Sequence, residues 1–347
     1  MAAKRHETRG ARRRKAAARG GSHLVLGAHQ SIAGGFTKAV DRAVETGCEC
    51  LQVFTRNINR WDAAPLDLAE AAAFRKAVEA AGLRLVIAHD SYLINPAAAD
   101  KTLRRKSIAG LVTELGRAEV LGIPWVVAHP GAAGEQPVDV AVRRAADGIA
   151  EALAATKNLA AGILIETTAG QGSCLGATFA EIGTMLARID AVPGLARRVG
   201  VCLDTCHVFA AGYALAPQAA LDATLREFDA CIGLNRLVAI HANDSKKDRG
   251  SRVDRHEAIG KGKIGREAFR LLLEDRRLRG IPMFLETPKE NTRGVMTPAQ
   301  DRANLATLRR LATEKRPHRS GGIARPCGSP SSAPTSASIR RRTSAPR

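Results

Sequence analysis

The feature that most constrains the fold is an eightfold alternation of short apolar runs with amphipathic segments between residues 24 and 312. A short apolar run bounded by turn and helix signals, such as Val201-Cys202-Leu203, is typical of a buried parallel strand. The runs cover residues 24–27, 50–54, 85–88, 125–128, 163–165, 201–203, 237–240 and 283–285. Eight strands, each followed by a helix, predict a single closed (β/α)8 TIM barrel of α/β class, whose usual size is roughly 250 residues.

The segments between these runs carry helix signals. Asp67 is a plausible N-cap and Gly82 a plausible end for one helix, and Phe179, Ile182 and Met185 follow helical spacing in another. The expected helices cover about residues 36–45, 67–80, 99–121, 138–158, 179–189, 219–231, 266–273 and 298–311. A doubly wound open sheet is the alternative, but no Gly-x-Gly-x-x-Gly follows the first strand.

The net charge of +19 lies mostly at the two ends of the chain. Residues 1–20 carry +7 and residues 315–347 carry +8, so the middle carries only +4. Low apolar content and many Arg, Ala, Ser, Pro or Gly residues predict disorder in both ends. We therefore expect a disordered basic extension over residues 1–21, the barrel over 22–314 and a disordered tail over 315–347. The extensions are either weak polyanion contacts or solvated segments without a role, and the N-terminal one also has the composition of an organellar transit peptide.

Cysteine usage and apolar segments also indicate the cellular compartment. The seven cysteines include no Cys-x-x-Cys pair, which favours reduced thiols over a disulfide framework. No apolar stretch approaches the roughly 18 residues that a membrane span needs, and the N-terminus lacks a secretory apolar segment. We expect a cytoplasmic protein without a membrane partner.

Six successive strands, from the third to the eighth, each end at a possible metal ligand. These residues are His89, His129, Glu166, Asp204, His241 and Glu286. A lone histidine at a strand end is more often a hydrogen-bonded core residue, and a lone glutamate is more often a solvated rim residue. In a barrel, however, all six point into the same mouth, where crowded carboxylates need compensation. Divalent cations supply it, and histidine with carboxylate suits zinc, with manganese or iron as alternatives.

Three further residues extend this set to nine. His207 follows Asp204 by three positions, which places it over the same rim if a helical turn begins there. Asp254 and His256 are separated by one residue in a polar loop after the seventh strand, and such a pair can chelate one ion. Nine ligands suggest three metal ions.

With these residues in place, the sequence resembles the apurinic/apyrimidinic endonuclease IV family of DNA repair enzymes over about residues 22–312. The motifs that carry the resemblance are Gly27-Ala28-His29, His89-Asp90-Ser91-Tyr92-Leu93, His129-Pro130-Gly131, Glu166-Thr167-Thr168-Ala169-Gly170, Asp204-Thr205-Cys206-His207, His241-Ala242-Asn243-Asp244-Ser245, Asp254-Arg255-His256 and Leu285-Glu286-Thr287-Pro288. Many motifs in order at fitting spacing make the signal specific.

The resemblance implies a zinc-dependent hydrolase that cuts double-stranded DNA on the 5′ side of an abasic site and leaves a 3′-hydroxyl, as a step of base excision repair. Trimming of 3′ ends is a further expected activity. It implies three Zn²⁺ per chain, with Mn²⁺ possible at one site. By position, the first ion would take His89, His129 and Glu166; the second Glu166, Asp204, His241 and Glu286; and the third His207, Asp254 and His256. Glu166 and Glu286 would also be catalytic, because they orient the nucleophile.

The same resemblance implies a DNA-contacting surface and a monomer that acts at the nucleoid. Tyr92 and Leu93 would wedge into the gap left by the flipped nucleotide. Family members often carry an Arg that fills the DNA stack in the loop after the second strand, where this chain has Asn59 with Arg60 beside it. A metal-dependent sugar isomerase or epimerase of the same barrel group is the alternative, since it needs only Glu166, Asp204, His241 and Glu286.

Overall fold

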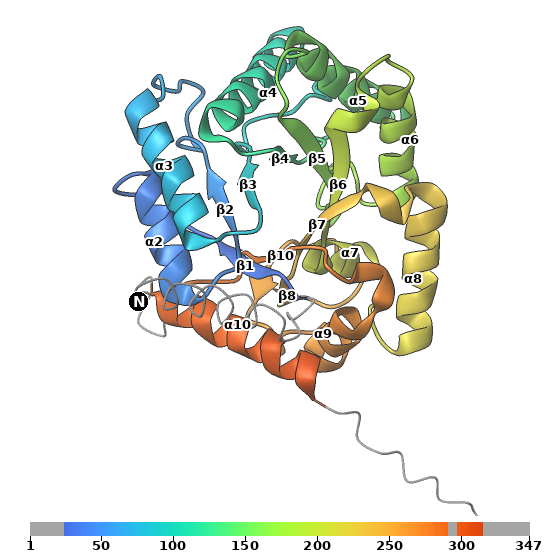
Figure 1. The fold of residues 1–347 in the computed structure, drawn as a ribbon. Helices are drawn as coiled ribbons and strands as arrows, with labels where there is room; N and C mark the ends of the chain where they lie inside the picture. Colours follow the sequence, from blue (N-terminus) through green and yellow to red (C-terminus); the bar gives the residue numbers. More distant parts are fainter. Residues whose placement is uncertain (1–23, 291–296, 315–347) are drawn as a thin grey trace, which may run out of the picture. The chain divides into compact units, whose positions relative to one another are not determined.

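Eight parallel strands close into a barrel, viewed along its axis in Figure 1. The computed structural model describes residues 24–290 and 297–314. The barrel strands are β1 (Leu26–His29), β2 (Cys50–Phe54), β3 (Val86–His89), β4 (Trp125–Ala128), β5 (Gly162–Glu166), β6 (Val199–Asp204), β7 (Leu237–His241) and β10 (Met283–Leu285). The predicted TIM barrel is therefore confirmed. The predicted basic ends, at residues 1–21 and 315–347, lie outside the described residues.

A helix follows each barrel strand and lies on the outside of the ring. These helices are α2 (Phe36–Thr46), α3 (Leu68–Ala81), α4 (Lys101–Leu121), α5 (Val138–Ala155), α6 (Phe179–Asp190), α8 (Gln218–Cys231), α9 (Gly265–Glu274) and α10 (Pro298–Thr313). Side-chain caps fix three of their starts: Asp67 accepts from Ala69 N, Asp100 from Leu103 N and Thr178 from Glu181 N. None of the helices in the described ranges is long and apolar enough to cross a membrane.

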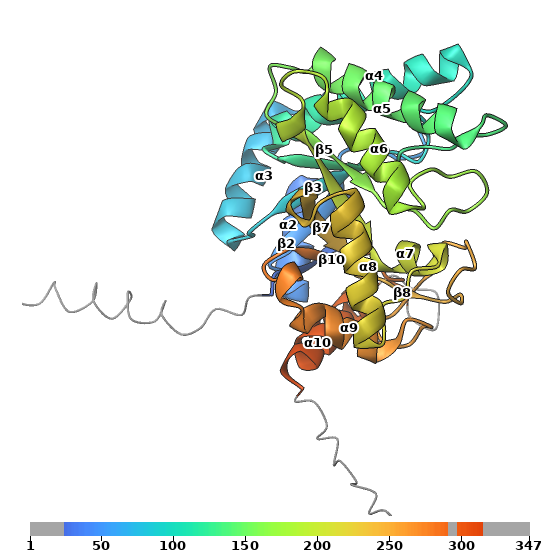
Figure 2. The same cartoon turned by 90° about the vertical axis from the view of Figure 1, so that its right-hand side faces the viewer.

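Additional short elements interrupt this repeat at one end of the barrel. Helix α7 (Thr205–Ala211) follows β6 directly, and strands β8 (Asp244–Ser245) and β9 (His256–Glu257) pair antiparallel after β7. Figure 2 shows α7 and β8 side by side at this end. Because this is the end at which the parallel strands finish, the extra elements are placed where TIM barrels carry their chemistry.

The inside of the barrel is filled by a small apolar cluster with one residue from, or just before, each of the eight strands. Its members are Val25, Cys50, Ile87, Val127, Leu164, Cys202, Ala239 and Phe284, all at most 2% exposed. Gly27 follows Val25 at the crowded wall between β1 and β2, where an added Cβ would lie 1.8 Å from the Cys50 carbonyl oxygen. A larger cluster lies between the strands and the surrounding helices and includes the predicted apolar face of α6.

Strand periodicity connects this interior cluster to the mouth of the barrel. Successive side chains of a strand point to opposite faces, so the residue two positions after each cluster member again points inward. Counting two positions on gives Gly27, then Gln52, His89, His129, Glu166, Asp204, His241 and Glu286. The sequence therefore places a layer of polar side chains directly above an apolar floor.

Candidate metal centre

Glu166 lies at the centre of the polar layer and is fully buried at the end of β5. Its Oε2 is 3.1 Å from His89 Nε2 and 3.0 Å from His129 Nε2. Its Oε1 is 2.7 Å from His241 Nδ1 and 3.4 Å from His207 Nδ1. One carboxylate is thus shared by imidazoles from four segments of the chain, a geometry that suits a bridging ligand.

A second group joins Glu166 to the last two barrel strands. His241 Nδ1 is also 3.3 Å from Glu286 Oε2 and 3.9 Å from Asp204 Oδ2. One ligand atom from each of these four residues lies within 4.8 Å of the others. Asn243 holds two of the carboxylates in place: its Nδ2 donates to Asp204 Oδ2 at 2.6 Å, and its Oδ1 accepts from the Glu286 backbone N–H at 2.8 Å. The structure therefore brings together the four residues predicted for the second ion.

A third group lies beside Asp204, and the local fold explains the three-residue spacing to His207. Asp204 Oδ1 accepts the His207 backbone N–H at 2.8 Å, so the last residue of β6 is also the N-cap of α7. His207 Nε2 then lies 3.2 Å from Asp254 Oδ2, and His256 Nε2 lies 3.2 Å from Asp254 Oδ1. These are the three residues predicted for the third ion.

The loop that carries Asp254 and His256 is fixed by a buried carboxylate. Asp244 accepts backbone N–H groups of Ser245, Gly260, Gly262 and Ile264 at 2.8–3.0 Å. The hairpin of β8 and β9 pairs Ser245 with His256 in addition. These hydrogen bonds tie residues 260–264 to β8, so Asp244 holds the loop closed around the third group.

The charges of the three groups depend on one another. Burial alone lowers the pKa of a histidine, but hydrogen bonding to Glu166 outweighs it and raises the pKa of His89 to about 9. Against the same effect of burial, the Asp204 charge and the Asp254 hydrogen bond raise the pKa of His256 to about 9. Conversely, His241 lowers the pKa of Glu286 to about 2, although burial opposes this shift. Without metal, the layer is held by imidazolium–carboxylate pairs.

The donor set fits divalent cations. His89, His207 and His256 each place Nδ1 within 2.8–3.2 Å of a backbone carbonyl, of Asp90, Thr167 and Glu286 respectively. Such a bond fixes the proton on Nδ1 and leaves the Nε2 lone pair toward the site. A neutral Nε2 and a carboxylate oxygen about 3 Å apart are both acceptors, so a proton or a cation must lie between them. His256 Nε2 is also buried, and its 3.2 Å contact with Asp254 Oδ1 lacks good hydrogen-bond geometry, as expected of two acceptors that face a common cation.

The residues predicted to contact DNA lie on two segments of the chain, one after β3 and one after β2. Tyr92 is 65% exposed, yet its ring centroid is 5.9 Å from that of His89 and 6.3 Å from that of His129. Leu93 beside it is partly exposed, and Asn59 and Arg60 are exposed in the loop after β2. The structure therefore places Tyr92 beside the first group, and the Ser91 hydroxyl links this segment to the Asn59 loop by donating to the Ile58 carbonyl.

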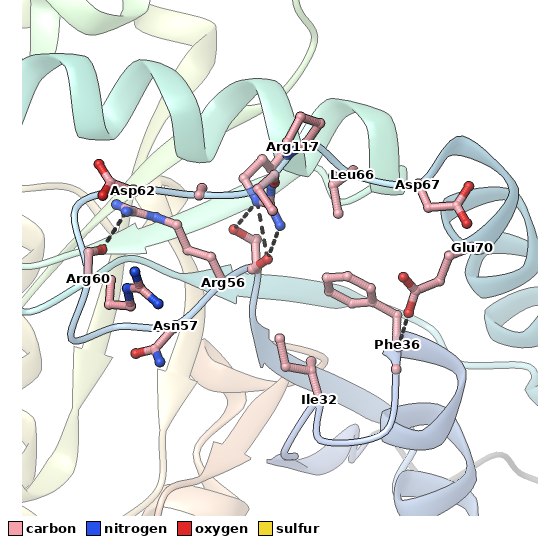
Figure 3. A pocket seen from close by; sticks show the side chains of 15 residues that line it. Ile32, Phe36, Arg56, Asn57, Arg60, Asp62, Leu66, Asp67, Glu70 and Arg117 are labelled. Carbon is pink, nitrogen blue, oxygen red and sulfur yellow. Dashed lines mark hydrogen bonds between the residues drawn. The ribbon is translucent and has the colours of Figure 1, made fainter.

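The loop that carries Asn59 and Arg60 is held by Arg56, whose guanidinium reaches the Arg60 backbone in Figure 3. The Arg56 guanidinium donates to the backbone carbonyls of Arg60 and Trp61 at 2.8 Å each. Its other side forms a buried ion pair with Glu114 of α4 at 2.6 Å. The loop is therefore held in one shape although its tip is exposed.

Several residues of the site were not predicted from the sequence. Gln52 bridges His241 and Glu286, and Asn243 and Asp244 fix carboxylates and the third-group loop. His29, at the end of β1, contacts Gln52, and burial lowers its pKa to about 3. The signal for Gln52 was present, since it interrupts the apolar strand Cys50-Leu51-Gln52-Val53-Phe54 two positions after an interior residue.

Comparison with known proteins first assigns a broad class. The family model of xylose isomerase-like TIM barrels matches residues 40–311. The chain also resembles a solved D-psicose 3-epimerase, with a TM-score of 0.60, 18% identity, and coverage of 83% of this chain and 99% of that one. At that identity the likeness concerns the fold alone. Fold and site together thus define a TIM-barrel protein with a histidine- and carboxylate-rich mouth.

Closer relatives narrow the class. A probable endonuclease 4 of Chloroflexus aggregans is 46% identical over 286 residues, which cover 82% of this chain and 97% of the relative. A probable endonuclease 4 of Geobacter sulfurreducens is 45% identical over 290 residues, 84% of this chain and 95% of the relative. The crystal structure of endonuclease IV from Thermus thermophilus matches with a TM-score of 0.71 and 36% identity, over 82% of this chain and 98% of that one. The chain belongs to the endonuclease IV family.

Proposed function

We propose that this protein is a DNA repair endonuclease that hydrolyses the phosphodiester on the 5′ side of an abasic site in duplex DNA and leaves a 3′-hydroxyl. Family membership supports nuclease chemistry. The observation that carries the proposal is the arrangement of three ligand groups around shared and neighbouring carboxylates, with Glu166 common to the first two and Asp204 beside the third. A DNA substrate also fits the expected location at the nucleoid in the cytoplasm, and we propose that the enzyme acts as a monomer.

We propose that the three groups hold three divalent cations, zinc in the first instance, with manganese as an alternative at one site. Such ions would supply Lewis acidity and a water of lowered pKa close to the scissile phosphate. His89, His129 and Glu166 would hold the first, and Glu166, Asp204, His241 and Glu286 the second. His207, Asp254 and His256 would hold the third.

The chain's own residues then orient the reactants. Glu166 is buried and belongs to both of the first two groups. Its Oε2 faces His89 and its Oε1 faces His241, so the carboxylate fixes the spacing between the two groups. Glu286 is partly exposed and is the carboxylate best placed to accept a hydrogen bond from an attacking water. The spacing of Asp204 and His207, which the N-cap bond fixes, would set the third group at a constant distance from the other two.

We propose that the exposed rim residues select the lesion. Tyr92 and Leu93 would fill the gap in the helix while the abasic nucleotide enters the mouth, a step that costs little because no base pair is lost. Asn59 and Arg60 would contact the DNA from the neighbouring loop. Since Arg56 holds this loop through two backbone carbonyls, the contact needs no ordering of the loop on binding.

A sugar epimerase offers the alternative within this fold, and the ligand groups argue against it. The second group alone would serve a single ion, whereas the first and third groups would then have no function. Their five additional imidazole and carboxylate side chains, His89, His129, His207, Asp254 and His256, lie within the same polar mouth.

The test is cleavage of a duplex with one abasic analogue, run beside the undamaged duplex and a ketose. We expect a single nick 5′ to the analogue, its loss in chelator and its return with zinc. Equal cleavage of the undamaged duplex would remove the lesion specificity from the proposal. Turnover of the ketose without cleavage of either duplex would replace it with the epimerase function.

A further inference from the structure

The side-chain amide of Gln52 connects two of the proposed ligands across the mouth of the barrel. Gln52 is 0% exposed in the middle of β2. Its Oε1 lies 2.7 Å from His241 Nε2, and its Nε2 lies 2.5 Å from Glu286 Oε1 and 3.0 Å from His29 Nδ1. Every polar atom of this buried amide therefore has a partner, and two of these partners belong to the second group.

The charge of Glu286 determines which way the amide faces. An ionised carboxylate accepts hydrogen bonds but cannot donate, so the amide nitrogen must be the atom beside Glu286. The amide oxygen then faces His241, and an oxygen requires a donor there. His241 must consequently carry a proton on Nε2, and its Nδ1 is the atom that faces Glu166, Glu286 and Asp204.

We infer that Gln52 is a positioning residue for the second metal ion: it fixes the tautomer and ring orientation of His241 so that Nδ1 is the ligand atom, and it restrains Glu286 through the same amide. The inference rests on the proposed function, because it names the ion that His241 and Glu286 would hold. Histidine ligands are oriented in this way by an acceptor on the opposite ring nitrogen, usually a carboxylate or a backbone carbonyl.

His241 differs in this respect from three other histidines of the site. His89, His207 and His256 have their outer nitrogen next to a backbone carbonyl, which a side-chain substitution leaves in place. The outer nitrogen of His241 faces a side chain from a different strand. Among these four histidines, His241 is therefore the one whose orientation a single side-chain substitution can release.

Two substitutions separate the contact of the amide with His241 from its contact with Glu286. Gln52→Met keeps the length of the side chain and removes the hydrogen bonds to His241, Glu286 and His29. Gln52→Glu keeps an acceptor for His241 but places a second carboxylate against Glu286. Gln136→Met is the matched control, because the Gln136 amide donates only to the backbone carbonyls of Ala97 and Ala133.

The first readout is zinc transfer from the loaded protein to a competing chelator. We expect Gln52→Met to weaken one zinc ion per chain by about 10–100-fold, the usual effect of removing a hydrogen-bond partner of a metal ligand. Gln52→Glu should weaken it less, and Gln136→Met should not change it. Unchanged zinc transfer in Gln52→Met would overturn the inference, as would equal weakening of every ion.

The second readout is the Nε2 proton of His241 in the metal-free protein, observed by NMR with 15N-labelled histidine. A hydrogen bond moves this proton signal downfield, so it should move upfield in Gln52→Met and stay near its wild-type position in Gln52→Glu. An unmoved signal in Gln52→Met would refute the contact itself. Because this measurement needs no metal, it tests Gln52 even if the wild-type chain takes up no zinc, a result that would instead sink the proposed function.

Discussion

Replacing Glu166 by glutamine tests how far the site depends on one buried charge. Glu166 oxygens lie 2.7–3.4 Å from nitrogens of four histidines. The substitution keeps the shape of the side chain and removes the negative charge that these imidazoles share. Since the apolar floor of the barrel does not contact solvent or depend on this charge, we expect the chain to stay folded.

The pKa of His89 gives the size of the effect on stability. The folded protein raises this pKa from 6.5 to about 9, with Glu166 as the main cause that opposes burial. A difference of roughly 2.5 pH units corresponds to about 3 kcal/mol at 1.36 kcal/mol per unit. Because the folded pKa is raised, this stabilisation is complete below pH 6.5 and is lost as the pH rises through about 9.

The assay is denaturant unfolding of the metal-free proteins between pH 6 and pH 10. We expect Glu166→Gln to be less stable than the wild type by about 3 kcal/mol near pH 6, with the difference shrinking toward pH 10. Glu135→Gln, which changes an exposed carboxylate in the loop after β4, is the matched control and should show no such trend. A stability difference for Glu166→Gln that is independent of pH would refute the reasoning.

The same variant should also lose activity. Removing an outer hydrogen-bond partner of a metal ligand costs about 10–100-fold, and a shared ligand should cost more, so we expect single-turnover incision to fall by over about 100-fold. An incision rate of Glu166→Gln within tenfold of the wild-type rate would contradict the proposed catalytic role of Glu166.

Three further predictions concern the loop, the barrel interior and protons. Asp244→Asn should leave backbone N–H groups unpaired at a cost of about 1–3 kcal/mol and release one zinc ion more readily to a chelator, while retained affinity for every ion would contradict the role of the loop. Phe284→Ala should lower the free energy of unfolding by about 3–5 kcal/mol in denaturant titrations, and a change under about 1 kcal/mol would argue against a packed interior. Zinc binding at pH 7 should release protons, because His89 and His256 stay protonated up to about pH 9 without metal. Calorimetry in two buffers of different ionisation enthalpy should therefore give different heats of zinc binding, and equal heats in the two buffers would contradict the prediction.

The sequence predicted the barrel because its strands and helices carry regular signals. Each inner strand is a short apolar run, and a helix such as α6 shows its buried face at helical spacing. The strand-end residues could be predicted as a site for the same reason, since parallel strands finish at one mouth. The predicted role of each residue as a ligand is a separate matter, which the experiments above address.

What the sequence did not reveal depends on contacts between distant segments. Strands β8 and β9 contain two residues each, too few to show periodicity, and their pairing is fixed by Asp244 and the loop that it holds. Gln52 lies in a strand that looked apolar, and the role inferred for it depends on which atoms of His241 and Glu286 face it. Such contacts join residues that are far apart in the sequence, and only the closed barrel brings these residues together.

The most direct test of the account is to count the metal ions in the active protein. The measurement is zinc per chain by elemental analysis, made on the same sample whose incision of the abasic duplex is recorded during removal and return of zinc. The account predicts three zinc ions per chain, with incision lost on their removal and regained on their return. A single ion per chain in a fully active sample, or incision that persists without metal, would contradict it.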